Sequence, residues 1–141
     1  MNYFEYIDSP YTIRDEIKRA HRLYWSRLAI AGSWWTGAER VDIAAECRAA
    51  VTCGFCAERK RALSPYTDEY KHESGTSLSD QTVDAVHRIV TDQTRITRNW
   101  IDSNQELGLS VESYVELSGI VVAVLSIDEF HRSLGISYEQ L

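Results

Sequence analysis

Apolar residues recur every three or four positions along most of the chain, and no segment shows a convincing alternation of apolar and polar residues. Such spacing places apolar side chains along one face of an α-helix. The first pattern of this kind consists of Ile13, Ile17, Ala20, Tyr24, Leu28 and Ala31. Because Ser caps helices and Pro suits their first turn, we predict that this helix begins at Ser9-Pro10 and ends at Gly32-Ser33. The protein is therefore predicted to be all-α.

Capping residues predict the next helices. Thr36 and Glu39 have the spacing of a capping box, which opens a second helix. A third, short helix is predicted to begin near Cys53 and to end at about Leu63. The sequence of residues 66–78 is polar and predicts a loop.

The longest predicted helix covers roughly residues 111–134, between a capping Ser110 and a C-terminal Gly135. Its middle is apolar nearly all round, so we expect it at the centre of a core or at an interface. With a fourth helix capped near Ser79 and a fifth around Trp100, the chain should contain about six helices.

Length and hydropathy indicate one domain that spans residues 1–141. A chain of 141 residues has the size of a single domain with one core. Its longest apolar run, Ile120 to Leu125, is far shorter than the ~18 residues that a membrane span requires, so we expect no membrane partner. Residues 1–8 carry acidic side chains and lack a basic region before an apolar core, which predicts a cytoplasmic protein without a signal peptide.

The charge of the chain argues against nucleic acid as a partner. The formal net charge is -6, whereas nucleic-acid binders usually present a basic patch or domain. The densest basic run, Arg59-Lys60-Arg61, is explained more simply as a solvated helix surface.

The candidate chemistry lies in the dithiol Cys53-Gly54-Phe55-Cys56. Three cysteines in a chain without an export signal make a structural disulfide framework improbable, so the pair suggests redox or metal chemistry and Cys47 suggests a small core residue. Residues three apart share one face of a helix, and a helix N-terminus stabilises a nearby thiolate. We therefore expect Cys56 to titrate below the usual value of about 8.5.

A zinc site and a thioredoxin-like site are less consistent with the sequence around the dithiol. A structural zinc site needs about four ligands. The remaining candidates show no ligand-like spacing: Cys47, His21, His72, His87 and His131. A thioredoxin-like site needs strands. We therefore expect a site without a metal or cofactor, and the alternative is that Cys53 and Cys56 are buried packing residues.

The surrounding segments resemble a known family. Residues Trp35-Thr36-Gly37-Ala38-Glu39-Arg40 through Cys53-Gly54-Phe55-Cys56 are similar to the motif of the AhpD-like (alkylhydroperoxidase D, carboxymuconolactone decarboxylase) superfamily, in which C-x-x-C follows a capped, Ala-rich helix. The segment from Tyr114 to Gly135 resembles the closing helix of that family. The resemblance covers about residues 33–136 and is strongest to the alkylhydroperoxidase-related (seleno)protein subgroup.

This resemblance implies an all-α, AhpD-like helical bundle that forms homo-oligomers. It also implies a metal-free thiol peroxidase or disulfide reductase, which reduces an alkyl hydroperoxide or a partner disulfide and is restored by a protein or small-thiol reductant. In the family, the second cysteine forms the sulfenic acid and the first resolves it, which assigns these roles to Cys56 and Cys53. Decarboxylase-type relatives need no C-x-x-C, so the intact dithiol argues against their activity here.

The proton relay of the family is not matched. Its peroxidases place a histidine four residues after the second cysteine and a glutamate twelve residues before the first, and this chain has Lys60 and Val41 there. Glu46, in an apolar stretch beside Cys47, is a candidate replacement because such a carboxylate can act as general acid or base.

A histidine is the second candidate for the relay. His131 lies near Asp128 and the end of the longest helix, and a histidine near a carboxylate is a plausible base. Glu116 has a similar standing. His72 and His87 are expected on the surface. The competing hypothesis is a non-catalytic, oligomeric helical protein with buried structural cysteines.

Overall fold

The computed structural model describes residues 3–64 and 71–141, and this part of the chain contains six α-helices, one short 3₁₀ helix and no strand. The elements are α1 (Asp15–Leu28), α2 (Gly37–Val51), α3 (Gly54–Arg61), α4 (Asp80–Asp92), η1 (Gln93–Arg95), α5 (Arg98–Ser103) and α6 (Val111–Ser133). The predicted all-α class is confirmed. The first part of the predicted polar loop lies outside the described residues, and residues 71–79 form no helix.

The predicted start of the first helix at Ser9-Pro10 is wrong, and so is its predicted end at Gly32-Ser33, because the helix ends at Leu28. The Ser9 hydroxyl instead accepts a hydrogen bond from the Tyr11 N–H at 3.1 Å and donates to the Tyr11 carbonyl at 3.0 Å, which closes a local turn. Helix α1 begins at Asp15, where two acidic residues in the first turn suit the positive end of the helix dipole.

The other predicted caps are confirmed. Thr36 and Glu39 form the capping box of α2 through hydrogen bonds of 3.2 and 2.9 Å between each side chain and the backbone N–H of the other residue. Ser79 and Ser110 accept hydrogen bonds from N–H groups in the first turns of α4 and α6. Gly135, with a φ of 69°, follows the end of α6.

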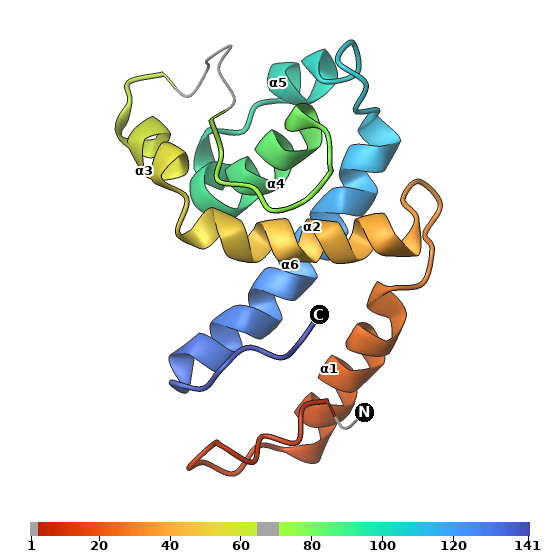
Figure 1. Cartoon of the computed structure of the whole chain (residues 1–141), viewed down its shortest axis with the longest axis vertical. Coiled ribbons are helices and arrows are strands. Elements are labelled where there is room, and N and C mark those ends of the chain that lie inside the picture. The colour runs from red at the N-terminus through yellow and green to blue at the C-terminus, as the bar shows by residue number, and fades with distance from the viewer. Residues whose placement is uncertain (1–2, 65–70) are drawn as a thin grey trace.

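The main core lies where α2, α4 and α6 pack together. Figure 1 shows α6 crossing behind α2, with α4 above the crossing. Fully buried apolar side chains from all three helices meet there, among them Ile43, Val86, Leu117 and Val121. The middle of α6 is thus central to the core, as its apolar sequence predicts. Val115 and Val122 on the same helix are exposed, and oligomer formation stays a prediction.

A second, smaller core joins the two ends of the chain. Its buried apolar members are Phe4, Tyr6, Ile13, Trp25 and Ile127. The Trp25 ring N–H donates to the Gln140 carbonyl at 2.6 Å, so the C-terminal segment is fastened beside α1 (Figure 1). Tyr24 packs against both cores, which agrees with a single domain, although the domain extent stays a prediction.

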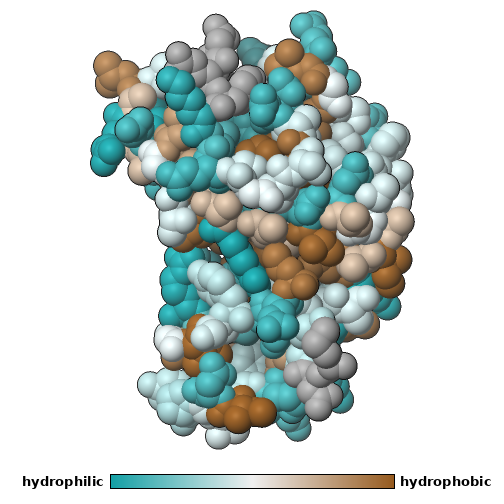
Figure 2. All heavy atoms as spheres, viewed as in Figure 1, coloured by the Kyte–Doolittle hydropathy of each residue, from teal (hydrophilic) through white to brown (hydrophobic). Residues whose placement is uncertain are grey.

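Hydrophilic residues cover most of the face shown in Figure 2, and hydrophobic residues gather near its middle. Within the described chain, none of the helices combines the length and apolar character needed to cross a membrane.

Candidate functional site

Two buried thiols lie where α2 gives way to α3. Cys53 occupies the N-cap position of α3, and Cys56 lies in its first turn. The predicted position of the dithiol at the start of a helix is confirmed. Both residues are buried, as is Cys47, and all three cysteines are free thiols.

Two histidines converge on the thiols from different elements. The Nδ1 atom of His87, on α4, lies 3.2 Å from the Cys56 sulfur. The Nδ1 atom of His72, on the loop before α4, lies 3.4 Å from the Cys56 sulfur and 3.6 Å from the Cys53 sulfur. The expectation that these histidines lie on the surface is wrong, because the His87 side chain is 0% exposed and that of His72 only 3%.

A carboxylate orients each imidazole. The Nε2 atom of His87 lies 2.8 Å from a Glu46 oxygen, and that of His72 lies 2.8 Å from an Asp84 oxygen. A carboxylate accepts hydrogen bonds, so Nε2 carries the proton in both rings. In its neutral form, each ring then presents the lone pair of Nδ1 to the sulfurs.

The two carboxylates are themselves held in place. Glu46, fully buried on α2, accepts hydrogen bonds from the hydroxyls of Ser74 at 2.6 Å and Thr76 at 3.1 Å. Asp84 on α4 pairs with buried Arg59 and, one helical turn away at 3.0 Å, with Arg88. The two carboxylates and the two imidazoles therefore belong to a connected set of hydrogen bonds and ion pairs.

The loop that carries His72 is fastened to α3 and α2. The backbone N–H of Glu73 donates to the Cys53 sulfur at 3.4 Å, and the Glu73 carboxylate accepts from the Gly54 N–H at 3.4 Å. Ser74 and Thr76 of the same loop donate hydrogen bonds to Glu46, so the loop is attached to α2 as well as to α3. Figure 1 shows it passing across α4.

The two thiols differ in acidity, and the expectation of a lowered pKa is not met at Cys56. Burial raises the pKa of Cys56 to about 12. Burial opposes ionisation of Cys53 as well, but hydrogen bonds from the backbone N–H groups of Glu73 and Cys56 outweigh it, so the Cys53 pKa falls below its usual value. Burial also lowers the pKa of His87, which keeps the ring neutral near pH 7.

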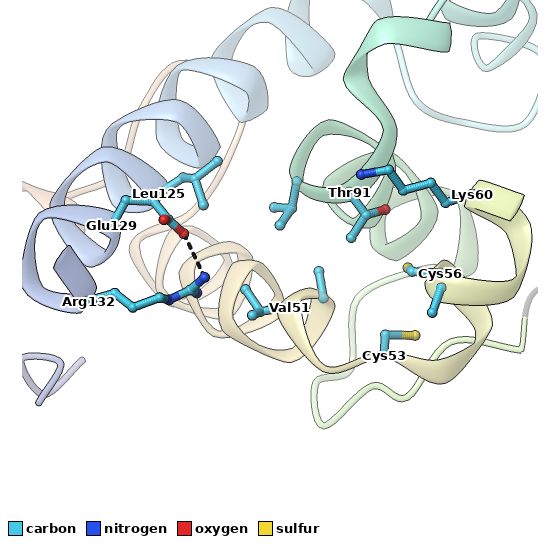
Figure 3. A pocket seen from close by; sticks show the side chains of 11 residues that line it. Val51, Cys53, Cys56, Lys60, Thr91, Leu125, Glu129 and Arg132 are labelled. Carbon is cyan, nitrogen blue, oxygen red and sulfur yellow. Dashed lines mark ion pairs between the residues drawn. The ribbon is translucent and has the colours of Figure 1, made fainter. Parts of the chain in front are cut away.

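A pocket of about 430 Å³ opens beside the thiols. Its lining combines apolar residues such as Val51 and Leu125 with Lys60. Figure 3 shows Cys53 and Cys56 on one side of this pocket, with an ion pair between Glu129 and Arg132 of α6 on the opposite side. The pocket gives a small molecule a place against the dithiol.

The structure brings one of the three candidate relay residues to the thiols. Glu46 lies in the site through its contact with His87. His131 does not, because it bonds to the Ser137 carbonyl and the Tyr6 hydroxyl in the second core. Glu116 instead accepts hydrogen bonds from three consecutive N–H groups of the turn before α2.

Sequence reasoning set His72 and His87 aside as surface residues and missed Asp84. A signal existed for His87, which lies four residues after Val83 and three before Val90, on the apolar face of its helix. His72 had no such signal, because it follows a polar segment without periodicity.

The same residues contain a set of potential metal ligands. One donor atom from each of Cys53, Cys56, His72 and His87 lies within 4.8 Å of all the others. Comparison with protein-family models, with curated proteins and with solved structures found no match. The function must therefore be inferred from the chemistry of the site.

Proposed function

We propose that the protein is a thiol-dependent oxidoreductase that uses Cys53 and Cys56 to reduce an alkyl hydroperoxide or a partner disulfide. The observation that supports this most directly is the chain of contacts from the Cys56 sulfur to His87 and on to Glu46, beside a pocket. A nucleophile, a base in contact with it and a carboxylate that orients the base form the usual arrangement of an activated nucleophile.

In the proposed reaction, burial keeps the Cys56 thiol protonated at rest, so His87 accepts its proton through Nδ1 only as the sulfur attacks, and Glu46 stabilises the imidazolium that forms. The Cys56 thiolate attacks the terminal peroxide oxygen, the O–O bond breaks, and the alkoxide leaves as an alcohol with the proton from His87. Cys56 is then a sulfenic acid. Cys53 attacks its sulfur, an S–S bond forms and water leaves.

An external thiol or dithiol closes the cycle. It donates two electrons and two protons to the Cys53–Cys56 disulfide through thiol–disulfide exchange and is itself oxidised to a disulfide. The apolar side chains of the pocket, such as Val51, Val90 and Leu125, suit the organic part of an alkyl hydroperoxide.

The same residues would let an AhpD-like protein work without the usual relay residues. Val41 packs against the main core, and Lys60 lines the pocket. Glu46 on α2 and His87 on α4 supply the carboxylate and the imidazole from other positions of the chain.

The test treats the reduced, metal-free protein with a stoichiometric alkyl hydroperoxide and identifies the products by peptide mass mapping. Wild type should form a Cys53–Cys56 disulfide. Cys53→Ser should accumulate a sulfenic acid on Cys56, trapped by a 1,3-dione reagent. Glu46→Gln should slow the oxidation by about 10²- to 10⁴-fold, the usual contribution of acid–base catalysis.

Cys47→Ser is the matched control and should oxidise at the wild-type rate, because Cys47 lies outside the site. If Cys53 and Cys56 of wild type stay reduced while the peroxide persists, the protein is not a peroxidase. If they also fail to exchange with a small disulfide, the competing hypothesis of structural cysteines holds.

A further inference from the structure

We propose that Cys53, Cys56, His72 and His87 form a zinc-binding site. The inference goes beyond the oxidoreductase function and does not depend on it, because zinc binding requires only the reduced thiols and the two neutral imidazoles. The four donors come from the N-terminus of α3, the loop before α4 and α4 itself.

The spacing of the donors fits tetrahedral zinc. With Zn–S near 2.3 Å and Zn–N near 2.0–2.1 Å, a tetrahedral ion separates a sulfur from a nitrogen by about 3.6 Å. Three sulfur–nitrogen distances between the cysteines and the histidines are 3.2, 3.4 and 3.6 Å. All four donors also lie within 4.8 Å of one another, so a single ion can reach them with small movements.

The direction of the lone pairs supports the same conclusion. His72 places one Nδ1 atom near both sulfurs at once, although a single lone pair accepts only one well-directed hydrogen bond. The Nδ1 atom of His87 faces the same region. Two thiols and two lone pairs that face a common point are the donor set of a Cys₂His₂ zinc site.

The hydrogen-bond partners of the two imidazoles are of the kind that zinc-bound histidines usually have. Metal-bound imidazoles almost always donate the other ring N–H to a carboxylate, a carbonyl or water. Here His72 donates to Asp84 and His87 donates to Glu46, each at 2.8 Å. The backbone N–H of Glu73, 3.4 Å from the Cys53 sulfur, is placed to stabilise a bound thiolate.

The charges of the site can be balanced by the metal. Two thiolates neutralise Zn²⁺, and the Asp84 carboxylate is already paired with Arg59 and Arg88. The fully buried carboxylate of Glu46 accepts hydrogen bonds from two hydroxyl groups and one imidazole N–H. Mixed thiolate and imidazole ligands favour zinc over Mg²⁺ or Ca²⁺, which prefer oxygen.

Four protein ligands complete the coordination of zinc and leave no open position, which is typical of a structural site. Bound zinc would occupy the lone pairs on Cys56 and His87 that the proposed peroxide reaction uses. The zinc-loaded and peroxide-reactive forms are therefore alternative states of the same reduced protein.

The experiment uses the full chain, reduced and stripped of metal under anaerobic conditions. Zn²⁺ is titrated in competition with a chromophoric chelator, and Co²⁺ serves as a spectroscopic probe. Wild type should bind one Zn²⁺ ion per chain, and its Co²⁺ form should show thiolate charge-transfer bands with the d–d bands of a tetrahedral site. X-ray absorption of the zinc form should show sulfur neighbours at about 2.3 Å and nitrogen neighbours at about 2.0–2.1 Å.

Variants assign the ligands. Cys53→Ser and His72→Gln should weaken zinc binding strongly, and Cys53→Ser should diminish the charge-transfer bands. Asp84→Asn should lower the affinity by about 10- to 100-fold and keep the Co²⁺ spectrum, as expected of a residue that positions a ligand. Cys47→Ala and His21→Gln are the matched controls and should bind as wild type does.

The proposal is overturned if wild type takes up no Zn²⁺, or if its Co²⁺ form lacks thiolate bands. It is also overturned if the Cys53→Ser, Cys56→Ser double variant binds zinc as tightly as wild type. The absorption and Co²⁺ measurements on wild type decide the question even if a variant fails to fold. Peroxide oxidation of the metal-free protein is measured separately, so failure of one proposal is distinguishable from failure of the other.

Discussion

Asp84 pairs with several buried side chains of the site. Its carboxylate contacts Arg59 of α3, Arg88 one turn along α4, and His72 of the loop. Burial alone would raise the pKa of Asp84, but the hydrogen bond from His72 and the two guanidinium groups lower it to about 2. The carboxylate is therefore ionised at neutral and mildly acidic pH, and it neutralises cations that have little access to water.

Removing this carboxylate should destabilise the protein severely. We expect Asp84→Ala to lower the free energy of unfolding of the metal-free protein by about 3–5 kcal/mol, because Arg59 and Arg88 would stay buried without this partner. Denaturant titration measures the change. Glu129→Gln, which breaks an exposed ion pair with Arg132, should cost about 1 kcal/mol or less. Equal losses in the two variants would contradict the assigned role of Asp84.

The predictability of the site differed from residue to residue. Cys53 and Cys56 could be identified because their spacing is itself a motif, and Glu46 because a carboxylate in an apolar helix stretch needs a partner. His72 and Asp84 could not be found, because their contact depends on the conformation of a loop whose sequence shows no periodicity. The sequence could not show that His131 lies away from the thiols, because proximity to a carboxylate in sequence does not show which core the ring enters.

Among the elements, α2 depends on close contact with the chain that precedes it. Gly37 is its first residue, and a Cβ atom added there would clash with the carbonyl oxygen of Ala29. Gly119 in α6 differs, because a Cβ atom there would meet nothing within 4 Å. Gly37 and Gly119 therefore serve different purposes in their helices.

Alanine at these two positions should change stability in opposite directions. Gly37→Ala should lower the free energy of unfolding by about 1–3 kcal/mol, since a backbone carbonyl must move. Gly119→Ala should raise it by about 0.5–1 kcal/mol, because Ala loses less conformational freedom than Gly in a helix. Both are measured by thermal and denaturant unfolding, and stabilisation by Gly37→Ala would show that the contact with Ala29 is not limiting.

Helix α1 and the N-terminal segment should respond to mild acid. Burial, and then the nearby His131, lowers the pKa of His21, whose Nδ1 lies 2.6 Å from the Tyr6 hydroxyl. A lowered pKa means that the folded state prefers neutral His21. Its contribution to stability is complete above the unfolded pKa of about 6.5 and is lost as the pH falls through the lower folded value.

We therefore expect the free energy of unfolding to decrease between pH 7 and pH 5, and to decrease less in His21→Gln. His87 contributes a change of the same sign, because its pKa is also lowered, so the comparison between wild type and variant isolates His21. Denaturant titrations at several pH values measure both slopes. Identical slopes would show that His21 does not contribute.

Element boundaries were predictable where a local cap determines them. Thr36, Ser79 and Ser110 satisfy the first N–H groups of their helices with their own side chains, so sequence alone locates those ends. Arg14, the N-cap of α1, makes no such side-chain bond. The start of α1 is instead set by packing of the N-terminal segment in the second core, which sequence spacing does not reveal.

At the scale of the whole molecule, the site joins parts that the main core holds less strongly. Helix α3 is short, and its buried residues are Cys56 and Arg59, both of which contact α4 or the loop through polar groups. The loop is likewise attached through Glu46 and Cys53 rather than by extensive apolar packing. Zinc bound to the four proposed ligands would therefore tie α3 and the loop to α4.

Zinc should consequently stabilise the fold as well as the site. If Zn²⁺ binds only the folded chain, free zinc at 100 times its Kd should raise the free energy of unfolding by about 2.7 kcal/mol, and a strong chelator should reverse the gain. Cys53→Ser should abolish the gain, whereas Cys47→Ala should retain it. Hydrogen exchange should show the largest zinc-dependent protection in α3 and residues 71–79, because these segments are held mainly by the ligands. Protection spread evenly over α1, α2 and α6 would indicate that zinc acts elsewhere on the protein.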